Sequence, residues 1–333
     1  MEKRQILRIS VVIAVILSFV FGNVGYSSAK TLKYTMPNPL DTTVGRFAST
    51  LADLVKKESK GEIIIQVYPS SQLGGKDEML DGVKIGTIEM VGQDFSALAR
   101  FYDDLGVFNF PYLYRDGEHA GRASGPGSPI YERMNKILVE KAGVRMLGNM
   151  YYGSRMLTCN SPIYNPDGLK GKKIRAIPIP IWIAMVEGMG AIATPVDFAE
   201  LSTALATGIV DGQENPLTTI WNNKFYQLQK YLMVTNHINT LSPFAVNEKV
   251  WQGLTENQRR IIVEAGQKSK KINFERGVQE EEALMLKIKE AGIKVISEKD
   301  GLDVKAFRDR VLKYCLSKFP QWNNYIKEIQ EVK

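Results

Sequence analysis

Histidine and cysteine are scarce in this sequence of 333 residues, which contains two of each. His119 and His237 have no partner at the spacing of a metal site, and no His-Glu-x-x-His segment is present, so no metal is expected. The glycine patterns of phosphate-binding loops and dinucleotide-binding folds are absent, as is the Gly-x-Ser-x-Gly segment that presents a serine nucleophile. These absences argue against an enzyme and against a cofactor. We expect His119 to be exposed in a polar helical stretch and His237 to make structural hydrogen bonds.

Two cysteines are too few for a fold that depends on several disulfides. Cys159 and Cys315 either form one bridge or remain buried as small apolar residues, and the sequence leaves both possibilities open. Apolar residues make up 44% of the chain, which is ample for a core that needs no disulfide.

Long runs of one charge are missing as well. The formal net charge is +7, and it falls to about +5 when the first 29 residues are left out. Charged residues of both signs are interspersed along the chain, with no block of five or more like charges, which is typical of an ordinary solvated surface. We therefore expect no nucleic-acid partner.

The N-terminus has the pattern of a secretory signal. Lys3, Arg4 and Arg8 flank a run from Ile9 to Phe21 that contains no charged residue. This run is shorter than the roughly 20 residues that a membrane-spanning helix needs. Small residues at positions 27 and 29 suit a signal peptidase, so we predict that residues 1–29 are removed and that the mature protein lies in the periplasm or another extracytoplasmic space. An uncleaved N-terminal anchor is the alternative.

From Lys30 onward, strand and helix patterns alternate. Strand-like runs rich in β-branched residues surround a helical pattern at 42–59, which makes a βαβ opening. The expected strands are residues 31–36, 62–68, 88–91, 144–150, 156–158, 173–176 and 232–235. This alternation predicts an α/β fold with largely parallel sheets, and about 300 mature residues predict two domains.

One helix is predicted to be unusually long. Residues 255–258 form a capping box, and no proline interrupts the helical pattern before Gly292. A helix over residues 256–291 would be about 54 Å long, more than the diameter of one such domain, so we expect it to cross between the two. Two helices broken at Gly277 are the alternative.

Two arginines are candidates for binding an anion. Arg155 follows a predicted strand and a glycine-containing turn, and Arg175 lies at the end of an apolar strand, where an unpaired guanidinium would be costly. The planar guanidinium matches a carboxylate with two parallel hydrogen bonds, which lysine cannot do. Arg175 is the stronger candidate, because its neighbours Ile174 and Ala176 are apolar, whereas the alternative for Arg155 is a surface ion pair.

Polar residues also follow several predicted strands, where ligands generally bind in α/β folds. Asn215 stands in Gln-Glu-Asn-Pro, and its alternative role is to cap the next helix. Gln93 and Asp94 follow the third strand, and Asn38 and Asp41 follow the first. Each of these could instead cap a helix, and we expect Asp41 to do so.

In their order, these segments resemble one family. They are residues 152–155 (Tyr-Gly-Ser-Arg), 169–175 (Leu-Lys-Gly-Lys-Lys-Ile-Arg), 204–216 (Ala-Leu-Ala-Thr-Gly-Ile-Val-Asp-Gly-Gln-Glu-Asn-Pro), 224–226 (Lys-Phe-Tyr) and 235–237 (Thr-Asn-His). The chain is similar to the DctP-like solute-binding proteins of TRAP (tripartite ATP-independent periplasmic) transporters. The resemblance covers essentially the whole mature chain, including residues 72–75 and 108–113.

The resemblance implies a two-lobed α/β periplasmic binding protein with a hinge, a ligand cleft between the lobes and a long helix that spans both. We expect residues 30–152 and about 241–280 in lobe I, and residues 153–240 and about 281–333 in lobe II. The resemblance assigns the ligand carboxylate to Arg175, further ligand contacts to Arg155 and Asn215, and lesser roles to Asp94 and Gln93. It also implies that the chain is an extracytoplasmic subunit, expected to be a monomer, that delivers a small organic acid to TRAP membrane permease subunits.

The substrate is less well defined than the family. Asn38 lies in a loop that departs from many relatives, and Trp182 follows Arg175 at a position that varies. Asp94 would repel a second carboxylate, which favours a hydroxylated monocarboxylate such as a sugar acid. A wall made by Trp182, Trp221 or Phe198 would favour an aromatic acid, and a C4-dicarboxylate or a 2-oxo acid stays possible. An exported enzyme acting on a small acid is the alternative from another class.

Overall fold

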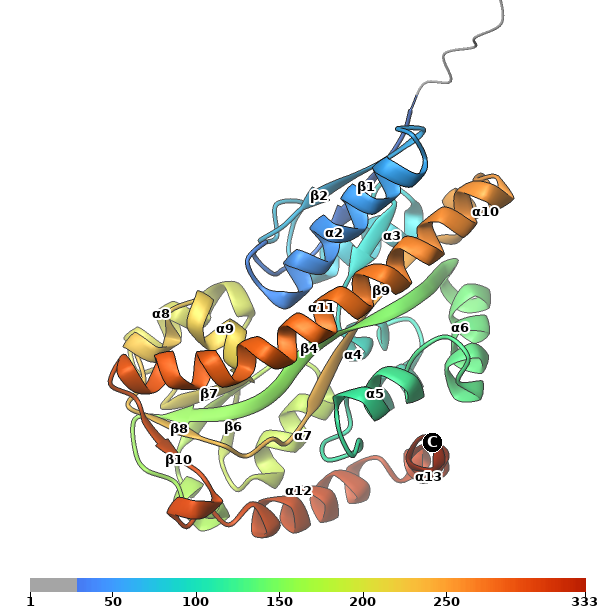
Figure 1. Cartoon of the computed structure of the whole chain (residues 1–333). Helices are drawn as coiled ribbons and strands as arrows, with labels where there is room; N and C mark the ends of the chain where they lie inside the picture. The colour runs from blue at the N-terminus through green and yellow to red at the C-terminus, as the bar shows by residue number, and fades with distance from the viewer. Residues whose placement is uncertain (1–28) are drawn as a thin grey trace, which may run out of the picture.

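The computed structural model describes residues 29–333, which form two lobes joined side by side (Figure 1). The predicted signal segment, apart from its last residue, lies outside the described residues. Within the described part of the chain, no helix is both long and apolar enough to cross a membrane.

Lobe I is built on three parallel strands. β1 (Lys30–Thr35) pairs with β2 (Ile63–Tyr68) on one side and with β3 (Met90–Gly92) on the other. Helix α2 (Thr43–Glu58) connects β1 to β2, and Thr42 caps it by accepting a hydrogen bond from the Gly45 N–H. The sequence analysis expected Asp41 to cap this helix, which is wrong, because the capping side chain is that of Thr42. Helix α3 (Lys76–Ile85) then leads to β3.

The rest of lobe I consists mainly of short helices. They are α4 (Phe95–Leu98), the 3-10 helix η1 (Asp103–Asn109), α5 (Gly117–Ala123), α6 (Pro129–Ala142) and α10 (Glu248–Gln252).

Lobe II repeats the parallel arrangement. β5 (Lys173–Ala176) lies between β6 (Ile192–Pro195) and β7 (Gly212–Pro216), and both pairings are parallel. Helices α7 (Pro180–Gly188), α8 (Leu201–Ala206) and α9 (Leu217–Asn222) connect or follow these strands. A second short parallel pair, β8 (Tyr231–Met233) with β10 (Lys294–Ile296), extends this lobe.

Two long strands join the lobes. β4 (Val144–Cys159) pairs with β9 (Asn239–Asn247) along its first part and with β7 and β8 along its second, and all these pairings are antiparallel. β9 also runs antiparallel to β3, so the strand order is β2-β1-β3-β9-β4-β7-β5-β6. The expectation of largely parallel sheets therefore holds within each lobe and is wrong for the strands that connect them.

The two strands predicted over residues 144–158 are one continuous strand. The expected turn at Gly153 is an irregularity in the pairing of β4 with β9, and Gly153 has a φ of +127°. A glycine tolerates this φ without strain, so β4 bends there and continues. Arg155 therefore lies within a strand, two residues after the bend.

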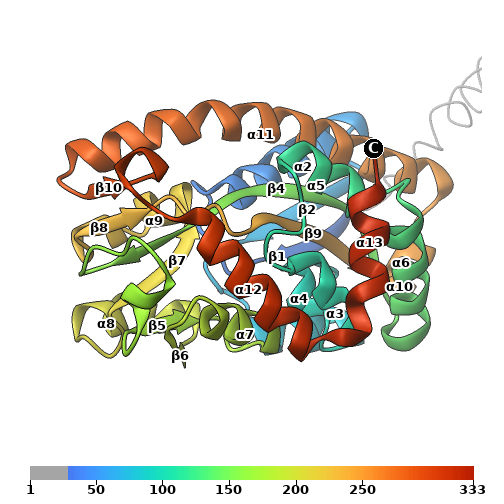
Figure 2. The same ribbon diagram turned by 90° about the horizontal axis from the view of Figure 1, so that it is seen from below.

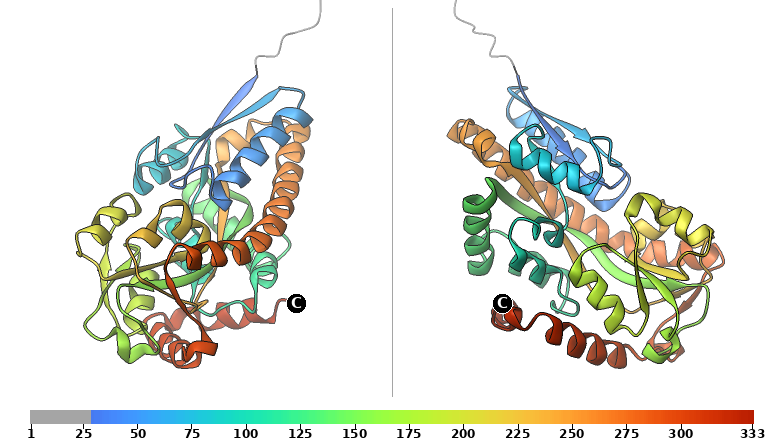
Figure 3. Two further views of the ribbon diagram at one scale, coloured as in Figure 1. Left: turned by 60° about the vertical axis from the view of Figure 1, so that its left-hand side comes forward. Right: turned by 180° about the vertical axis from the view of Figure 1, so that it is seen from behind.

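Helix α11 (Glu256–Glu290) is one unbroken helix of 35 residues, about 52 Å long. It begins at Thr255 with the predicted capping box, contacts α2 and β4, and then reaches α9 of lobe II. Figure 3 shows it passing along both lobes. The predicted spanning helix is confirmed, and the alternative break at Gly277 is not present.

The C-terminal segment returns from lobe II to lobe I. Helix α12 (Val304–Lys318) packs on α7, whereas α13 (Asn323–Glu331) lies beside α6 (Figure 2). Arg133 of α6 binds Glu328, and the Arg122 Nε donates to the Lys333 carbonyl at 2.9 Å. The assignment of all of residues 281–333 to lobe II was therefore wrong for α13, because its polar partners are in lobe I.

His119 also differs from its expectation. Its side chain is fully buried, and its Nε2 lies 3.1 Å from the carbonyl oxygen of Ile329, while its Nδ1 accepts a hydrogen bond from the Arg115 N–H. It thus holds the C-terminal helix against α5. Cys159 and Cys315 are both buried and free, so the structure selects the reduced form.

Candidate functional site

A cavity of about 80 Å³ lies between the two lobes. Six of the seven predicted binding residues line it, namely Asn38, Gln93, Asp94, Arg155, Arg175 and Asn215. Its other lining residues are Pro37, Lys76, Tyr152, Ile177, Pro178, Asp197, Phe198 and Ser242. The lining comes from the ends of β1, β3 and β5, from β4, β7 and β9, and from the loops that follow. Strand ends meet at this edge of each lobe, which is why polar residues as far apart in the chain as Asn38 and Asn215 come together.

Arg155 is held by a buried ion pair. Its Nη2 donates to Oε1 of Glu214 at 2.9 Å, to the Glu214 carbonyl at 2.8 Å and to Oδ1 of Asn215 at 3.0 Å, and its Nε also bonds Glu214. Arg155 is 1% exposed and Glu214 is 0% exposed. Although burial opposes the charged form, Arg155 and His237 lower the pKa of Glu214 to about 2. Most of the hydrogen-bonding capacity of Arg155 is thus used inside the protein.

His237 supports Glu214 from behind. Its Nε2 lies 2.9 Å from Oε2 of Glu214, and its Nδ1 lies 2.8 Å from Oγ1 of Thr235. Burial lowers the pKa of His237, with Glu214 opposing that shift, so the ring is neutral at pH 7 and donates from Nε2 to the carboxylate. The prediction that His237 makes structural hydrogen bonds is confirmed.

Arg175 is buried and makes no ion pair with the residues that the structure describes. Its Nε donates to the Val196 carbonyl at 2.8 Å, and this is the one hydrogen bond of its side chain to the described residues. Arg175 is 2% exposed, and burial lowers its pKa from 12.5 to about 10, partly offset by Glu214 and Asp197. Its two terminal nitrogens therefore remain available to an anion in the cavity, and their planar arrangement matches the two oxygens of a carboxylate.

Amide and hydroxyl groups complete the cavity. Asn38 Nδ2 donates to the Tyr152 hydroxyl at 2.6 Å, and that hydroxyl lies 2.9 Å from Oγ1 of Thr219. Asn215 does not cap a helix, because Pro216 occupies the N-cap of α9. Its side chain instead bridges Gln213 and Arg155.

Two carboxylates and one lysine also face the cavity. Asp94 accepts a hydrogen bond from Oγ of Ser242 at 3.2 Å, and burial raises its pKa, with Arg155 opposing the shift. The Gln93 amide contacts Sδ of Met79 at 3.3 Å, a weak acceptor. Lys76 of lobe I and Asp197 of lobe II make no side-chain hydrogen bond or ion pair within residues 29–333.

Trp182 is the one predicted residue that the structure does not bring to the cavity wall. It lies in the first turn of α7, where it is 1% exposed, and its ring packs 4.7 Å from the Arg155 guanidinium. Its Nε1 donates to Oγ of Ser96 at 2.8 Å, which joins lobe II to lobe I. Trp182 therefore positions Arg155 and contacts the opposite lobe. Of the other two aromatic candidates, Phe198 lines the cavity, whereas Trp221 stacks on Tyr226.

The sequence analysis missed several site residues. Glu214 stands beside Asn215 in the Gln-Glu-Asn-Pro segment, but its pairing with Arg155, 59 positions away, has no local signal. Lys76, Tyr152, Asp197 and Ser242 carry no local signal either. They face the cavity because α3, β4, the segment after β6 and β9 bring them there, which no local pattern records.

Two lobes that share a cavity, together with a buried arginine whose terminal nitrogens make no hydrogen bond within residues 29–333, are typical of a solute-binding protein. The family model described as "Bacterial extracellular solute-binding protein, family 7" (DctP) matches residues 35–318. The chain belongs to this family, whose members are substrate-binding proteins of periplasmic transport systems and not enzymes.

Three relatives illustrate the similarity. The 2,3-diketo-L-gulonate-binding periplasmic protein YiaO of Escherichia coli is 30% identical over 292 residues, which are 86% of this chain and 87% of YiaO. The sialic acid-binding periplasmic protein SiaP of Vibrio cholerae is 32% identical over 285 residues, 85% of this chain and 86% of SiaP. A TRAP periplasmic solute-binding protein from Polaromonas, solved with D-erythronate bound, is 30% identical with a TM-score of 0.84, covering 91% of this chain and 99% of its own.

Proposed function

We propose that this protein captures a small hydroxylated monocarboxylate in the cavity between its lobes and delivers it to the membrane permease subunits of a TRAP transporter. The observation that carries this proposal is Arg175, a buried cation whose two terminal nitrogens have no partner among the described residues. A carboxylate is the anion that its planar fork binds with two parallel hydrogen bonds.

The other charges in the cavity support a ligand with a single carboxylate. Arg155 is already neutralised by Glu214, so it offers little to a second anionic group. Asp94 and Asp197 would repel such a group, whereas both can accept hydrogen bonds from hydroxyls. The ligands named for the three relatives are all hydroxylated or oxidised sugar acids, in keeping with this chemistry.

Binding and closure are proposed to be coupled. Asn38, Gln93 and Asp94 belong to lobe I, whereas Arg175, Asp197 and Asn215 belong to lobe II, so one ligand would touch both. A ligand favours the closed form only by its extra contacts in that form. The hinge is proposed to lie where β4, β9 and α11 pass from one lobe to the other. Lobe I is proposed to contain residues 30–152, about 241–280 and helix α13. Lobe II is proposed to contain residues 153–240 and about 281–318.

The setting of this function is part of the same proposal. The export of the chain by cleavage of residues 1–29 and its action as a monomer that binds no nucleic acid are proposed from the sequence. The permease partner is proposed from the family and from the transporter type named for the Polaromonas relative.

Thermal unfolding of the mature protein with a panel of acids tests the proposal. The panel contains aldonates, hydroxy acids, C4-dicarboxylates, 2-oxo acids and aromatic acids. An acid at a hundredfold excess over its Kd stabilises the protein by about 2.7 kcal/mol. We expect hydroxylated monocarboxylates to give the largest shifts. A larger shift with dicarboxylates would contradict the assigned roles of Asp94 and Asp197, and no shift with any acid, using protein refolded free of ligand, would contradict the proposal as a whole.

A further inference from the structure

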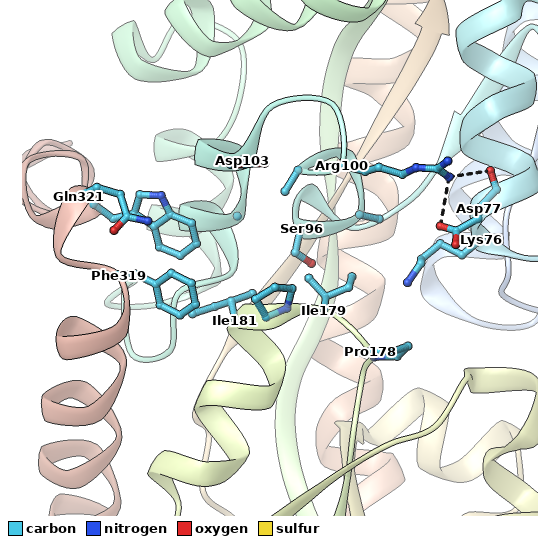
Figure 4. Close-up of a pocket in the computed structure, with 15 residues that line it drawn as sticks. Lys76, Asp77, Ser96, Arg100, Asp103, Pro178, Ile179, Ile181, Phe319 and Gln321 are labelled. Carbon is cyan, nitrogen blue, oxygen red and sulfur yellow. Dashed lines mark hydrogen bonds and ion pairs between the residues drawn. The ribbon is translucent and has the colours of Figure 1, made fainter.

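A second, larger cavity lies next to the candidate site. Its volume is about 430 Å³, and its walls come from three separate parts of the chain (Figure 4). Lobe I contributes residues of α3, α4 and the segment that follows, lobe II contributes the start of α7, and the third part is the segment after α12. We call it the outer cavity, and the site around Arg175 the inner cavity.

The floor of the outer cavity is mainly apolar. Ile179 and Ile181 lie on one side, and on another lie Phe319 and Trp322, whose rings stack with centroids 4.4 Å apart. This surface is suited to an apolar group, because each Å² of apolar surface removed from water contributes roughly 25 cal/mol.

The charges on the lobe I side of the outer cavity are largely neutralised. Arg100 lies 3.3 Å from a carboxylate oxygen of Asp77 and 3.0 Å from one of Asp81. Lys76 and Asp103 are the exceptions, since neither makes an ion pair with the described residues. The amino group of Lys76 extends toward Pro178 and Ile179 (Figure 4). The outer cavity thus offers no second anion site comparable with Arg175.

The two cavities share part of their walls. Lys76 and Pro178 line both, so they form the boundary between the inner and the outer space. The inner cavity, at about 80 Å³, holds roughly five to eight water-sized groups. A carboxylate with a few hydroxylated carbons fills that volume, and any longer ligand must extend past Lys76.

We infer that the outer cavity is a second part of the ligand site, which holds the apolar far end of a hydroxy acid whose carboxylate is bound by Arg175. This inference rests on the proposed function. It follows from the shared wall, from the limited inner volume and from the apolar lining beyond it. The ligand class is therefore a 2-hydroxy acid with a branched or aromatic end.

Calorimetric titration of a series of acids tests the inference. Lactate, 2-hydroxy-4-methylpentanoate and 3-phenyllactate share one head group and differ in their apolar ends, and D-erythronate is a short polar reference. An aromatic ring buried in the outer cavity should strengthen binding about 10- to 100-fold relative to lactate. Equal affinities along the series would overturn the inference. Failure of all four acids to bind would also overturn the inference, whereas the proposed function fails only if no acid of the wider panel described above binds.

Variants of the outer cavity separate its role from that of the inner one. Ile179→Trp should fill the outer cavity, and Ile209→Trp is the matched control, because Ile209 is exposed in lobe II away from both cavities. We expect Ile179→Trp to weaken 3-phenyllactate at least tenfold while D-erythronate binds as before. Phe319→Ala, which removes part of the cavity wall without adding bulk, should also weaken 3-phenyllactate and leave D-erythronate binding as before. The variant should keep the secondary structure of the unaltered protein. An equal loss for both acids, or no loss for 3-phenyllactate in either variant, would overturn the inference.

Discussion

Arg155 and Arg175 line the same cavity, yet replacement by methionine should destabilise the ligand-free protein only at Arg155. Arg155→Met removes the partner of Glu214, which is 0% exposed and has its pKa lowered to about 2. The carboxylate would keep only His237 as a side-chain partner. Breaking a buried ion pair on one side typically costs about 3–5 kcal/mol, and we expect a loss of that size.

Arg175→Met should have no such penalty. Burial lowers the pKa of Arg175 from 12.5 to about 10, so the folded protein holds the charged guanidinium at a penalty of about 3 kcal/mol at pH 7. The variant loses the hydrogen bond from Nε to Val196, worth about 1 kcal/mol. The free energy of unfolding should therefore be unchanged or higher by about 1–2 kcal/mol, while binding is lost.

Urea-induced unfolding at pH 7 measures both effects, on protein refolded from denaturant so that no acid remains bound. The same samples are then titrated with the acid that binds the unaltered protein best. Removing one partner of a buried charge pair costs about 2–5 kcal/mol, so Arg175→Met should weaken binding roughly 30-fold or more, and Arg175→Lys should also bind poorly. A loss of stability in Arg175→Met as large as in Arg155→Met would refute the idea that Arg175 is held unpaired for a ligand.

Three further predictions concern specificity and pH. Asp94→Asn should lower the ratio of the C4-dicarboxylate Kd to the monocarboxylate Kd by about tenfold, because one negative charge is removed from the cavity. Competitive titration measures this ratio, and an unchanged ratio would argue against repulsion by Asp94. Burial lowers the pKa values of His119 and His237 below 6.5, so on acidification these histidines take up protons in the unfolded chain before they do so in the folded protein. The free energy of unfolding, measured with urea, should therefore fall as the pH drops from 6.5 to 5. A free energy of unfolding that stays constant over this range would contradict the prediction. Burial also lowers the pKa of Lys270 to about 8, so the folded protein loses this proton at a lower pH than the unfolded chain does. The free energy of unfolding should therefore rise between pH 8 and 10 in the unaltered protein and rise less in Lys270→Met. Equal slopes of the free energy of unfolding against pH in the two proteins would contradict the prediction.

The sequence predicted the regular elements well where the pattern is strong. The capping box and the absence of proline gave the long helix α11, because helix signals are local and add up over 35 residues. The pattern failed at β4, where Gly153 suggested a turn. A glycine with positive φ serves a turn and a bend in a strand equally well, and only the pairing with β9 and β7 distinguishes them.

The site could be predicted from sequence in part. Six of the seven residues proposed from the sequence line one cavity. Five of them stand at or near strand ends, which are visible as a change of composition, whereas Arg155 lies within β4. Lys76 and Asp197 were missed because their position depends on how the two lobes meet.

The sequence by itself determined the alternation of strands and helices, the absence of catalytic and metal motifs, and which arginines stand within strand patterns. The tertiary structure alone decided that Arg155 is neutralised by Glu214, while the terminal nitrogens of Arg175 have no partner in the part of the chain that the structure describes. It also decided that Trp182 supports Arg155 from outside the cavity. The physical reason is that pairing and burial are set by contacts between segments far apart in the chain. Arg155 and Glu214 are 59 positions apart, and no local pattern shows which of two similar arginines will meet a carboxylate.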